Sequence, residues 1–356
     1  MASTYIIITS SFPASEADYS GHFIQSEVQQ ITQCGGVAHV ICPARGSSAA
    51  NKQNWNEHPI QPAVAFGPPG ALRRLRQSPW LIFSVLLYCF RARQVVRRLL
   101  APNSAEEVII RAHWLVPHLW PIVPAQVGNA QVVGIVHGSD LRLLGRLPQP
   151  CRSVLWRLFK KRKPKLEFVS RELRDEAAQA APERLKSWIL GAKIQPALLD
   201  IPSALLQLDT SAKRELRRRL LSDLQLESQS HPEATAKDTE ALKLFVVIGR
   251  LIKSKRIDTI LRAHLLMPDT QLVCIGEGPL LDNFQLNYPR AVFLGALPRY
   301  RTLEWILVAD ALLSASRTEG ASTVIREAEQ LGTPVVAAAS GDLIADTQAR
   351  RIIRNQ

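Results

Sequence analysis

The sequence predicts an α/β protein made of two Rossmann-like domains, each a doubly wound parallel sheet. Short apolar runs alternate with longer helical patterns along the chain, which favours parallel strands covered by helices on both faces. The alternation stops in a polar region between Asp200 and Leu242, which separates two halves. Ligands of open α/β sheets bind beyond the carboxyl ends of the strands, so we expect the domains to face a cleft that holds the site.

The chain has 356 residues, 46% of them hydrophobic, which suits about two domains with full cores. We expect a first domain at 1–202, a linker with a connecting helix at 203–241 and a second domain at 242–356. Ten apolar runs are predicted strands, at 5–9, 38–42, 107–111, 132–136, 166–169, 243–248, 270–275, 291–294, 311–314 and 334–338. Seven segments are predicted helices, at 22–34, 81–100, 171–181, 258–267, 280–287, 300–308 and 322–331.

The net charge of +13 favours anionic partners, such as phosphorylated ligands or an anionic membrane surface. Nucleic acid is not an expected partner, because aromatic residues make up only 6% and no basic stretch is interleaved with them as a stacking platform. The 5 cysteines are odd in number and lack zinc or redox spacing. We therefore expect free thiols in a reducing cytosol.

Residues 79–90 form an almost continuous apolar run with arginines on both sides. The run is shorter than the roughly 20 apolar residues that a spanning helix needs. Two interpretations stay open: the segment 72–100 lies in the interface of an anionic bilayer, or it is a core helix with solvated basic ends. The N-terminus lacks the pattern of a secretory signal, so we expect a cytoplasmic protein, peripheral on the inner membrane face if the first interpretation holds.

In the second half, cations stand directly after a predicted strand. Gly249 and Arg250 follow the run at 243–248, and Lys255 comes five residues later. Such cations can neutralise a diphosphate leaving group, although a solvated basic loop would have the same pattern. Gly276 and Gly278 follow the next strand in a turn that lets backbone approach a ligand. The turn lacks the full dinucleotide fingerprint, which disfavours a dehydrogenase.

Two carboxylates, Glu319 and Glu327, lie eight residues apart around the start of a predicted helix. Eight helical residues rise about 12 Å, so the pair can hold both ends of an elongated polar ligand. The turn between them would present free N–H groups to a phosphate; it consists of Gly320, Ala321, Ser322 and Thr323. The pattern suits a nucleotide diphosphate sugar, and its alternative is a capped structural helix with a solvated Glu at each end.

The first half carries a glycine and two histidines near predicted strand ends. Gly21 at the mouth of the first helix is a candidate anion cradle. A His at the carboxyl end of a strand can bond sugar hydroxyls or orient a carbonyl, and both His113 and His137 have this position. His137 is followed by Gly, Ser and Asp140, whereas His113 is equally well explained as a packing residue. Neither has a third group at ligand spacing, so no metal is expected.

In this order, the motifs resemble the group-one (family four) retaining nucleotide-sugar glycosyltransferases, which have the glycosyltransferase-B fold. The resemblance runs over nearly the whole chain. Its remaining elements are Phe12-Pro13, Trp114 after His113, Ser170 after a strand, and Gly332-Thr333-Pro334-Val335-Val336 after Glu327. One departure is Arg256, which stands where the family often has Gly. The family also continues beyond the last residues of this sequence, so the second domain is expected to be shortened.

The resemblance implies that the first domain is the acceptor side and the second binds the donor. The implied catalytic residues are His137, Glu319, Arg250 and Lys255, with the two cations on the diphosphate and Glu319 on the transferred sugar. The implied donor-binding residues are Gly21, Gly249, Gly276, Gly278, Gly320, Ala321, Ser322, Thr323 and Glu327, the last on the ribose hydroxyls. Candidate acceptor-side residues are His113 and Asp140.

The activity implied by the resemblance is transfer of a sugar to a lipid-linked or polysaccharide acceptor, with retention, in cell-envelope or exopolysaccharide biosynthesis. It requires no cofactor, no metal and no protein nucleophile. Two alternatives remain: a non-catalytic nucleotide-sugar binding protein, and a nucleotide-sugar epimerase on the same fold.

Overall fold

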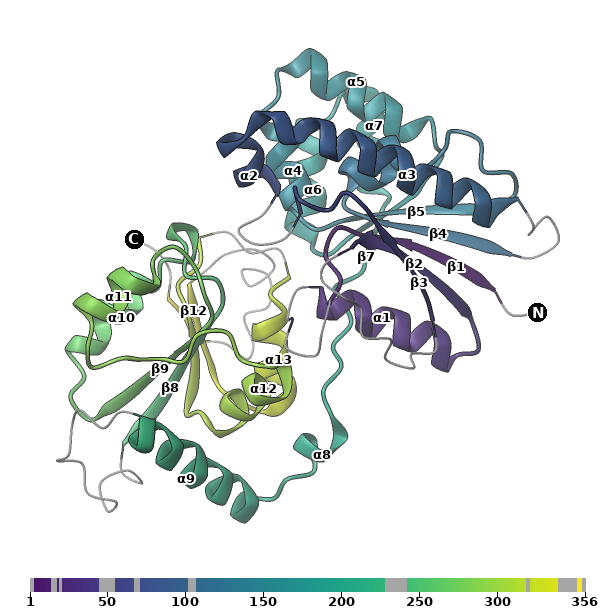
Figure 1. Ribbon diagram of the computed structural model, residues 1–356. Helices are drawn as coiled ribbons and strands as arrows, with labels where there is room; N and C mark the ends of the chain where they lie inside the picture. Colours follow the sequence, from purple (N-terminus) through teal and green to yellow (C-terminus); the bar gives the residue numbers. More distant parts are fainter. Residues whose placement is uncertain are drawn as a thin grey trace. The chain divides into compact units, whose positions relative to one another are not determined.

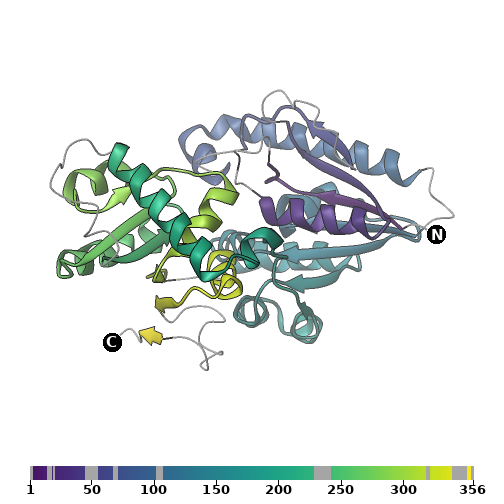
Figure 2. The ribbon, with the colours of Figure 1, turned by 90° about the horizontal axis from the view of Figure 1, so that it is seen from below.

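The computed structural model describes residues 3–13, 18, 21–44, 55–66, 71–101, 107–227, 242–317, 321–338 and 351–353 (Figure 1). The chain divides into two compact units, Met1–Leu198 and Leu199–Gln356. Each unit has its own parallel sheet with helices on both faces (Figures 1 and 2). The predicted fold class, two doubly wound α/β domains, is therefore confirmed.

In the described part of the first unit, seven parallel strands form a sheet in the order β3-β2-β1-β4-β5-β6-β7. The strands are β1 (Thr4–Ile8), β2 (Val37–Pro43), β3 (Asn56–Ile60), β4 (Val108–His113), β5 (Gln131–Val136), β6 (Lys165–Phe168) and β7 (Lys193–Ile194). The central strand β1 is apolar toward both faces, and Ile6, Ile7 and Ile8 are fully buried. Burial on both faces is typical of parallel sheets, which helices cover on each side.

The helices of the first unit lie on opposite faces of this sheet. They are α1 (His22–Gln33), α2 (Ala71–Gln77), α3 (Ile82–Leu100), α4 (Ser139–Gly145), α5 (Gln149–Lys160), α6 (Arg171–Ala180) and α7 (Glu183–Leu190). Figure 1 shows α1 on one face and α3 and α5 on the other. Right-handed crossovers explain this, because the step from β1 to β2 and the steps from β3 onward run in opposite directions across the sheet.

The described strands of the second unit pair in the order β10-β9-β8-β11-β12-β13. They are β8 (Lys243–Ile248), β9 (Thr270–Ile275), β10 (Val292–Phe293), β11 (Ala311–Ser314), β12 (Val335–Ala338) and β13 (Arg351–Ile353). The helices are α8 (Ser203–Leu206), α9 (Thr210–Glu227), α10 (Ile257–Leu265), α11 (Leu281–Asn287), α12 (Arg299–Val308) and α13 (Thr323–Leu331). Two apolar clusters form the core: Leu261 and Phe284 belong to one, and Leu220, Trp305 and Ile325 to the other.

The ten predicted strands and seven predicted helices are all present, with ends that differ by at most two residues. Strands β3, β7 and β13, which the sequence did not predict, all lie at or next to sheet edges. An edge strand is exposed on one side, so it does not need the apolar run by which a central strand is recognised. Strand β3 even contains a proline, Pro59, which edge strands tolerate.

Part of the region expected to link the domains is packed into the second unit. Helix α9 buries Leu216, Leu220 and Leu224 in the same apolar cluster as Trp305 of α12. Residues 228–241, the rest of the expected linker, lie outside the described residues.

Candidate active site

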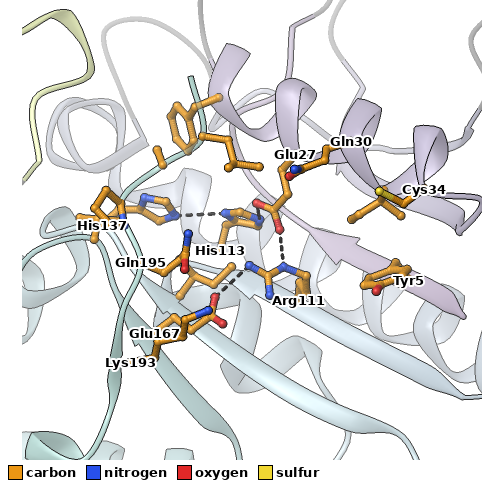
Figure 3. Close-up of a pocket in the computed structure, with 17 residues that line it drawn as sticks. Tyr5, Glu27, Gln30, Cys34, Arg111, His113, His137, Glu167, Lys193 and Gln195 are labelled. Carbon is orange, nitrogen blue, oxygen red and sulfur yellow. Dashed lines mark hydrogen bonds and ion pairs between the residues drawn. The ribbon is translucent and has the colours of Figure 1, made fainter. Parts of the chain in front are cut away.

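A pocket of about 340 Å³ lies in the first unit, against the face of the sheet that α1 covers (Figure 3). Its polar lining includes Glu27, Arg111, His113, His137 and Glu167. Side chains alternate between the two faces of a strand, so Arg111 and His113 of β4 share one face. Strand register places Glu167 beside Ile135, which itself pairs with His113, so the polar residues of β4 and β6 lie on either side of Ile135.

The two predicted histidines lie against each other. His113 ends β4 and His137 directly follows β5, and the Nδ1 atom of His113 lies 3.1 Å from the Nε2 atom of His137. Their rings are nearly parallel, with an interplanar angle of 19°. The rings of Trp114 and Phe23 flank His137, with centroids 4.6 Å and 5.2 Å away. Aromatic packing therefore fixes the position of the His137 ring.

Arg111 carries the positive charge of this pocket between two carboxylates. Its guanidinium pairs with Glu27 through Nε, and its Nη2 atom lies 2.9 Å from Glu167 Oε2 (Figure 3). Burial lowers the pKa of Arg111, but the charges of Glu27 and Glu167 outweigh it and raise that pKa. Burial also raises the pKa of Glu27, against the opposing effect of Arg111. The cluster holds one firm positive charge that two acids share.

The histidines of this region are neutral at physiological pH. Burial lowers the pKa of His137 to about 3, helped by the charges of His118 and Arg111. It lowers the pKa of His118 to about 4 and that of His113 well below its usual value. His113 and His118 are buried, whereas His137 is half-buried and borders the pocket. A neutral imidazole has one donor and one acceptor nitrogen. The hydrogen bond that one nitrogen makes therefore decides whether the other nitrogen donates or accepts.

Asp140 holds the loop that carries His137. Its carboxylate accepts hydrogen bonds from the backbone N–H groups of Gly138 at 3.0 Å, Leu115 at 3.1 Å and Leu141 at 3.2 Å. The side chain is only 2% exposed, and burial raises its pKa to about 6 although these bonds act in the opposite direction. Both carboxylate oxygens are thus bound to backbone in this structure.

Gly21 brings the loop after β1 to the start of α1. Its φ of +76° favours glycine, and a Cβ there would lie 2.1 Å from the carbonyl oxygen of Ser11. Residues 14–17, 19 and 20 of the same loop lie outside the described residues. The close approach shows why glycine is needed where the helix begins.

In the second unit, the two predicted glycine turns touch each other. The N–H of Gly249 donates to Ile275 O at 2.9 Å, and a Cβ on Gly276 would lie 2.1 Å from Gly249 O. A Cβ on Gly278 would lie 2.4 Å from Leu251 O. Backbone therefore lies against backbone at the carboxyl ends of β8 and β9, and no side chain fits between the turns.

The two predicted cations also lie at the carboxyl ends of the strands. Arg250 is exposed, and Lys255 ends a short helical turn, Lys253–Lys255. Lys255 Cε would lie 3.9 Å from a Cβ on Gly249, so the lysine stem runs beside the glycine turn. The N–H of Arg317 donates to Ser254 O at 3.1 Å and ties this turn to the segment after β11.

Of the two predicted carboxylates, Glu319 and Glu327, the structure describes only Glu327. Ala321 and Ser322 are half-buried directly before α13, and Thr323 begins that helix. Glu319 and Gly320 lie outside the described residues. Glu327 is 3% exposed, and its Oε1 atom lies 2.6 Å from Arg299 Nη1.

Sequence reasoning missed four charged residues of these clusters. The four are Glu27, Arg111, Glu167 and Arg299, of which Arg111 interrupts the apolar run of the strand that ends in His113. A charged residue inside a predicted buried strand was the available signal, since such a residue needs a partner. Among the residues that the structure describes, no three His, Cys, Asp or Glu side chains form a group that could hold a metal ion.

Comparison with known proteins finds similarity to sugar-transferring enzymes. Residues 243–355 match the family model described as "Glycosyl transferases group 1". The putative teichuronic acid biosynthesis glycosyltransferase TuaC of Bacillus subtilis (strain 168) is 24% identical over 339 residues, which cover 92% of this chain and 79% of that protein.

Solved structures agree in fold at low sequence identity. The catalytic domain of starch synthase IV from Arabidopsis thaliana, bound to ADP and acarbose, superposes with a TM-score of 0.69 at 14% identity, over 99% of this chain and 88% of that one. Anabaena Alr3699/HepE in complex with UDP gives a TM-score of 0.61 at 14% identity, over 99% and 85%. The chain therefore has the glycosyltransferase-B fold, and its residues 243–355 are similar to the group-one glycosyltransferases.

Proposed function

We propose that this protein transfers a sugar from a nucleotide diphosphate sugar to a lipid-linked or polysaccharide acceptor, with retention, in cell-envelope or exopolysaccharide biosynthesis. The relative from Bacillus subtilis, named for teichuronic acid biosynthesis, supports the biosynthetic setting. Structural neighbours in complex with UDP-glucose and with ADP support the class of donor. We further propose that the transferred sugar is a hexose.

One observation carries the proposal. Two glycine turns follow β8 and β9, and the cations Arg250 and Lys255 lie beside them at the carboxyl ends of these strands. The start of α13 follows β11 at the same end of the sheet, because the strands are parallel. The two cations would bind the donor diphosphate, and the first N–H groups of α13, near Ser322 and Thr323, would bind the distal phosphate. A site of this kind suits a diphosphate ligand.

The remaining donor contacts are assigned to the two acids and to the first unit. Glu327, held by Arg299, would bind the ribose hydroxyls, and Glu319 would bind the transferred sugar. His137 would lie beside the donor sugar and the acceptor, with Gly21 at the phosphate. No metal or cofactor is part of the proposal.

The proposed reaction breaks the bond between the anomeric carbon and the diphosphate oxygen. The acceptor hydroxyl attacks the same face of the sugar, and its proton passes to the leaving phosphate oxygen. The bond broken and the bond formed share one carbon and one face, which gives retention without a protein nucleophile. Arg250 and Lys255 lower the barrier by stabilising the negative charge that develops on the diphosphate.

We also propose that the first unit docks on an anionic membrane through α3 and the turn before it. Phe83, Leu86 and Phe90 are 73%, 56% and 58% exposed and lie along one side of α3, with Trp80 68% exposed just before it. The opposite side of α3 is buried, with Tyr88 and Val96 at 0%. An exposed apolar patch of this kind needs a partner.

The arginines around this patch favour an anionic bilayer as its partner. Arg76 lies before the patch and Arg91, Arg97 and Arg98 follow it, all exposed. Cations next to an apolar helix face are typical of helices that lie in a bilayer interface. No helix in the described part of the chain is long and apolar enough to cross a membrane. Peripheral binding would bring the enzyme to a lipid-linked acceptor at the inner face.

The donor is identified by a thermal-shift panel of UDP-, GDP- and ADP-sugars. We expect one base to raise the melting temperature, since a ligand that binds the native state stabilises it. NMR of the product made from that donor should show an anomeric configuration equal to that of the donor. Isomerised donor without acceptor would indicate an epimerase, binding without turnover would indicate a binding protein, and no shift with any nucleotide would contradict the proposal.

A further inference from the structure

A chain of three side chains runs through the pocket of the first unit, from α1 to the loop after β5. Glu27 Oε2 lies 3.3 Å from His113 Nε2, and His113 Nδ1 lies 3.1 Å from His137 Nε2 (Figure 3). His113 is 1% exposed, and its Nε2 atom has no regular hydrogen bond to any described residue. The Glu27 carboxylate is therefore the charged group in direct contact with this buried nitrogen, and Arg111 acts on the ring as a further charge.

We propose that Glu27 is a positioning residue that acts through His113 to fix the tautomer of His137, leaving His137 Nδ1 as a hydrogen-bond acceptor. The inference rests on the proposed function only for its consequence in catalysis. The assignment of the tautomer is argued from the arrangement of the three side chains alone.

The first step is electrostatic. A carboxylate oxygen repels a nitrogen lone pair and attracts an N–H group, so Glu27 favours the tautomer of His113 with its proton on Nε2. The contact is too bent for a regular hydrogen bond, but the sign of the interaction does not depend on a straight geometry. Arg111 stabilises the charge of Glu27, because its guanidinium pairs with the other carboxylate oxygen.

The second step follows from the stoichiometry of a neutral imidazole. With a proton on Nε2, His113 has only a lone pair on Nδ1, so the bond to His137 requires a proton on His137 Nε2. The remaining nitrogen of His137, Nδ1, is then an acceptor, and no described residue donates to it. Burial lowers the pKa of both rings, which keeps them neutral and preserves this order.

An acceptor nitrogen on His137 selects for a hydroxyl as its partner. In the proposed reaction, that hydroxyl belongs to the donor sugar or to the acceptor, and it donates its hydrogen to Nδ1. The opposite tautomer would present an N–H group, which cannot accept the hydroxyl hydrogen. The second nitrogen of a functional His is often fixed in this way by its neighbour.

The test is Glu27→Gln, with Glu167→Gln as the matched control. In Glu27→Gln, the Arg111 donors hold the amide oxygen, so the amide NH2 group takes the place of Oε2 and donates to His113 Nε2. This reverses both tautomers and moves the His137 proton to Nδ1. Glu167→Gln also removes one carboxylate from Arg111, but the contact of Glu167 in this cluster is to Arg111 alone.

The tautomers are measured by long-range ¹H–¹⁵N NMR on histidine-labelled protein, with peaks assigned from His113→Asn and His137→Asn. We expect the His137 proton on Nε2 in the wild type and in Glu167→Gln, and on Nδ1 in Glu27→Gln. A wild-type His137 with its proton on Nδ1 would overturn the proposal. So would an unchanged tautomer in Glu27→Gln, and the wild-type spectrum decides alone if that variant does not fold.

Transfer activity gives the second readout. We expect kcat to fall about 10- to 100-fold in Glu27→Gln and donor KM to stay within about threefold. Glu183→Gln, which changes an exposed acid of α7, should change neither by more than about threefold. The spectra need no turnover, so a tautomer reversal in a protein without transferase activity would refute the proposed function and leave the tautomer assignment intact.

Discussion

At the scale of single residues, Arg256 has a backbone conformation that suits glycine better. Its φ of 49° and ψ of 38° lie in the left-handed region, between the turn that carries Lys255 and the start of α10. A side chain costs about 1 kcal/mol in this conformation. The family often has glycine here, so the sequence departure coincides with local strain.

We expect Arg256→Gly to raise the free energy of unfolding by about 1 kcal/mol, measured by urea denaturation. The matched control is Arg262→Gly, an exposed position inside α10, which should lower it by about 1 kcal/mol. A lower stability of Arg256→Gly would contradict the strain.

His118 should make the stability of the protein depend on pH. Its ring is fully buried and its pKa is lowered to about 4 from 6.5, mainly by burial. The unfolded chain binds a proton near pH 6.5 that the native chain binds only near pH 4, so His118 stabilises less as pH falls. Between about pH 6.5 and pH 4, the contribution of His118 to the free energy of unfolding falls by about 3 kcal/mol.

The variant His118→Asn removes this titration and keeps a donor for the carbonyl of His113, which the His118 Nδ1 atom contacts. We expect the stability of the wild type to exceed that of the variant at pH 7.5, and the gap to shrink by about 3 kcal/mol at pH 4. Glu27 and Asp140, whose raised pKa values act in the opposite direction, are common to both proteins. If the difference in stability between the two proteins did not depend on pH, the claim that His118 is buried and neutral would be refuted.

Residues at strand ends were easier to predict from the sequence than residues that pair across the fold. His113 and His137 were predicted because a strand end is a local pattern. The partner of Arg111 was not, because Glu27 is 84 positions away along the chain and the two meet only through the order of strands. The same holds for Arg299 and Glu327, which lie 28 positions apart.

At the scale of elements, central strands were predictable and edge strands were not. Strands such as β1 and β8 are continuous apolar runs because both faces are covered. Strand β7 has only two residues, Lys193–Ile194, and carries no pattern that could be recognised. In the segment 72–100, α3 is buried on one side and exposes large apolar residues on the other, and membrane binding by the exposed side stays a prediction.

The exposed side of α3 gives a prediction about membrane binding. We expect Phe83→Ser with Phe90→Ser to weaken binding to phosphatidylglycerol vesicles at least tenfold, because each phenylalanine loses its burial in the interface. The control is Leu266→Ser with Leu286→Ser, which removes leucines of the second unit that are 84% and 81% exposed. Vesicle sedimentation measures both.

Wild-type binding should weaken as salt is raised and should be weak on phosphatidylcholine vesicles, because arginines attract the anionic lipid. Binding that is equal for the two double variants would contradict a role of α3. Absence of binding to the anionic vesicles would contradict the membrane proposal as a whole.

At the scale of the whole molecule, the alternation of strands and helices was enough to predict two doubly wound units. Pattern alone did not show with which unit the polar region packs. Helix α9 is polar on average, yet its leucines enter the apolar cluster of the second unit. A short apolar stripe on a charged helix indicates burial but does not name the surface that covers it.

The central claim is that the second unit binds the diphosphate of a nucleotide sugar through the cations after β8. It is tested most directly by calorimetric titration of the preferred donor into the wild type, Lys255→Ala and the control Lys253→Ala, an exposed lysine of the same turn. We expect Lys255→Ala to weaken binding about 10- to 100-fold and Lys253→Ala to change it less than about threefold. Equal affinity of Lys255→Ala and the wild type would contradict the account.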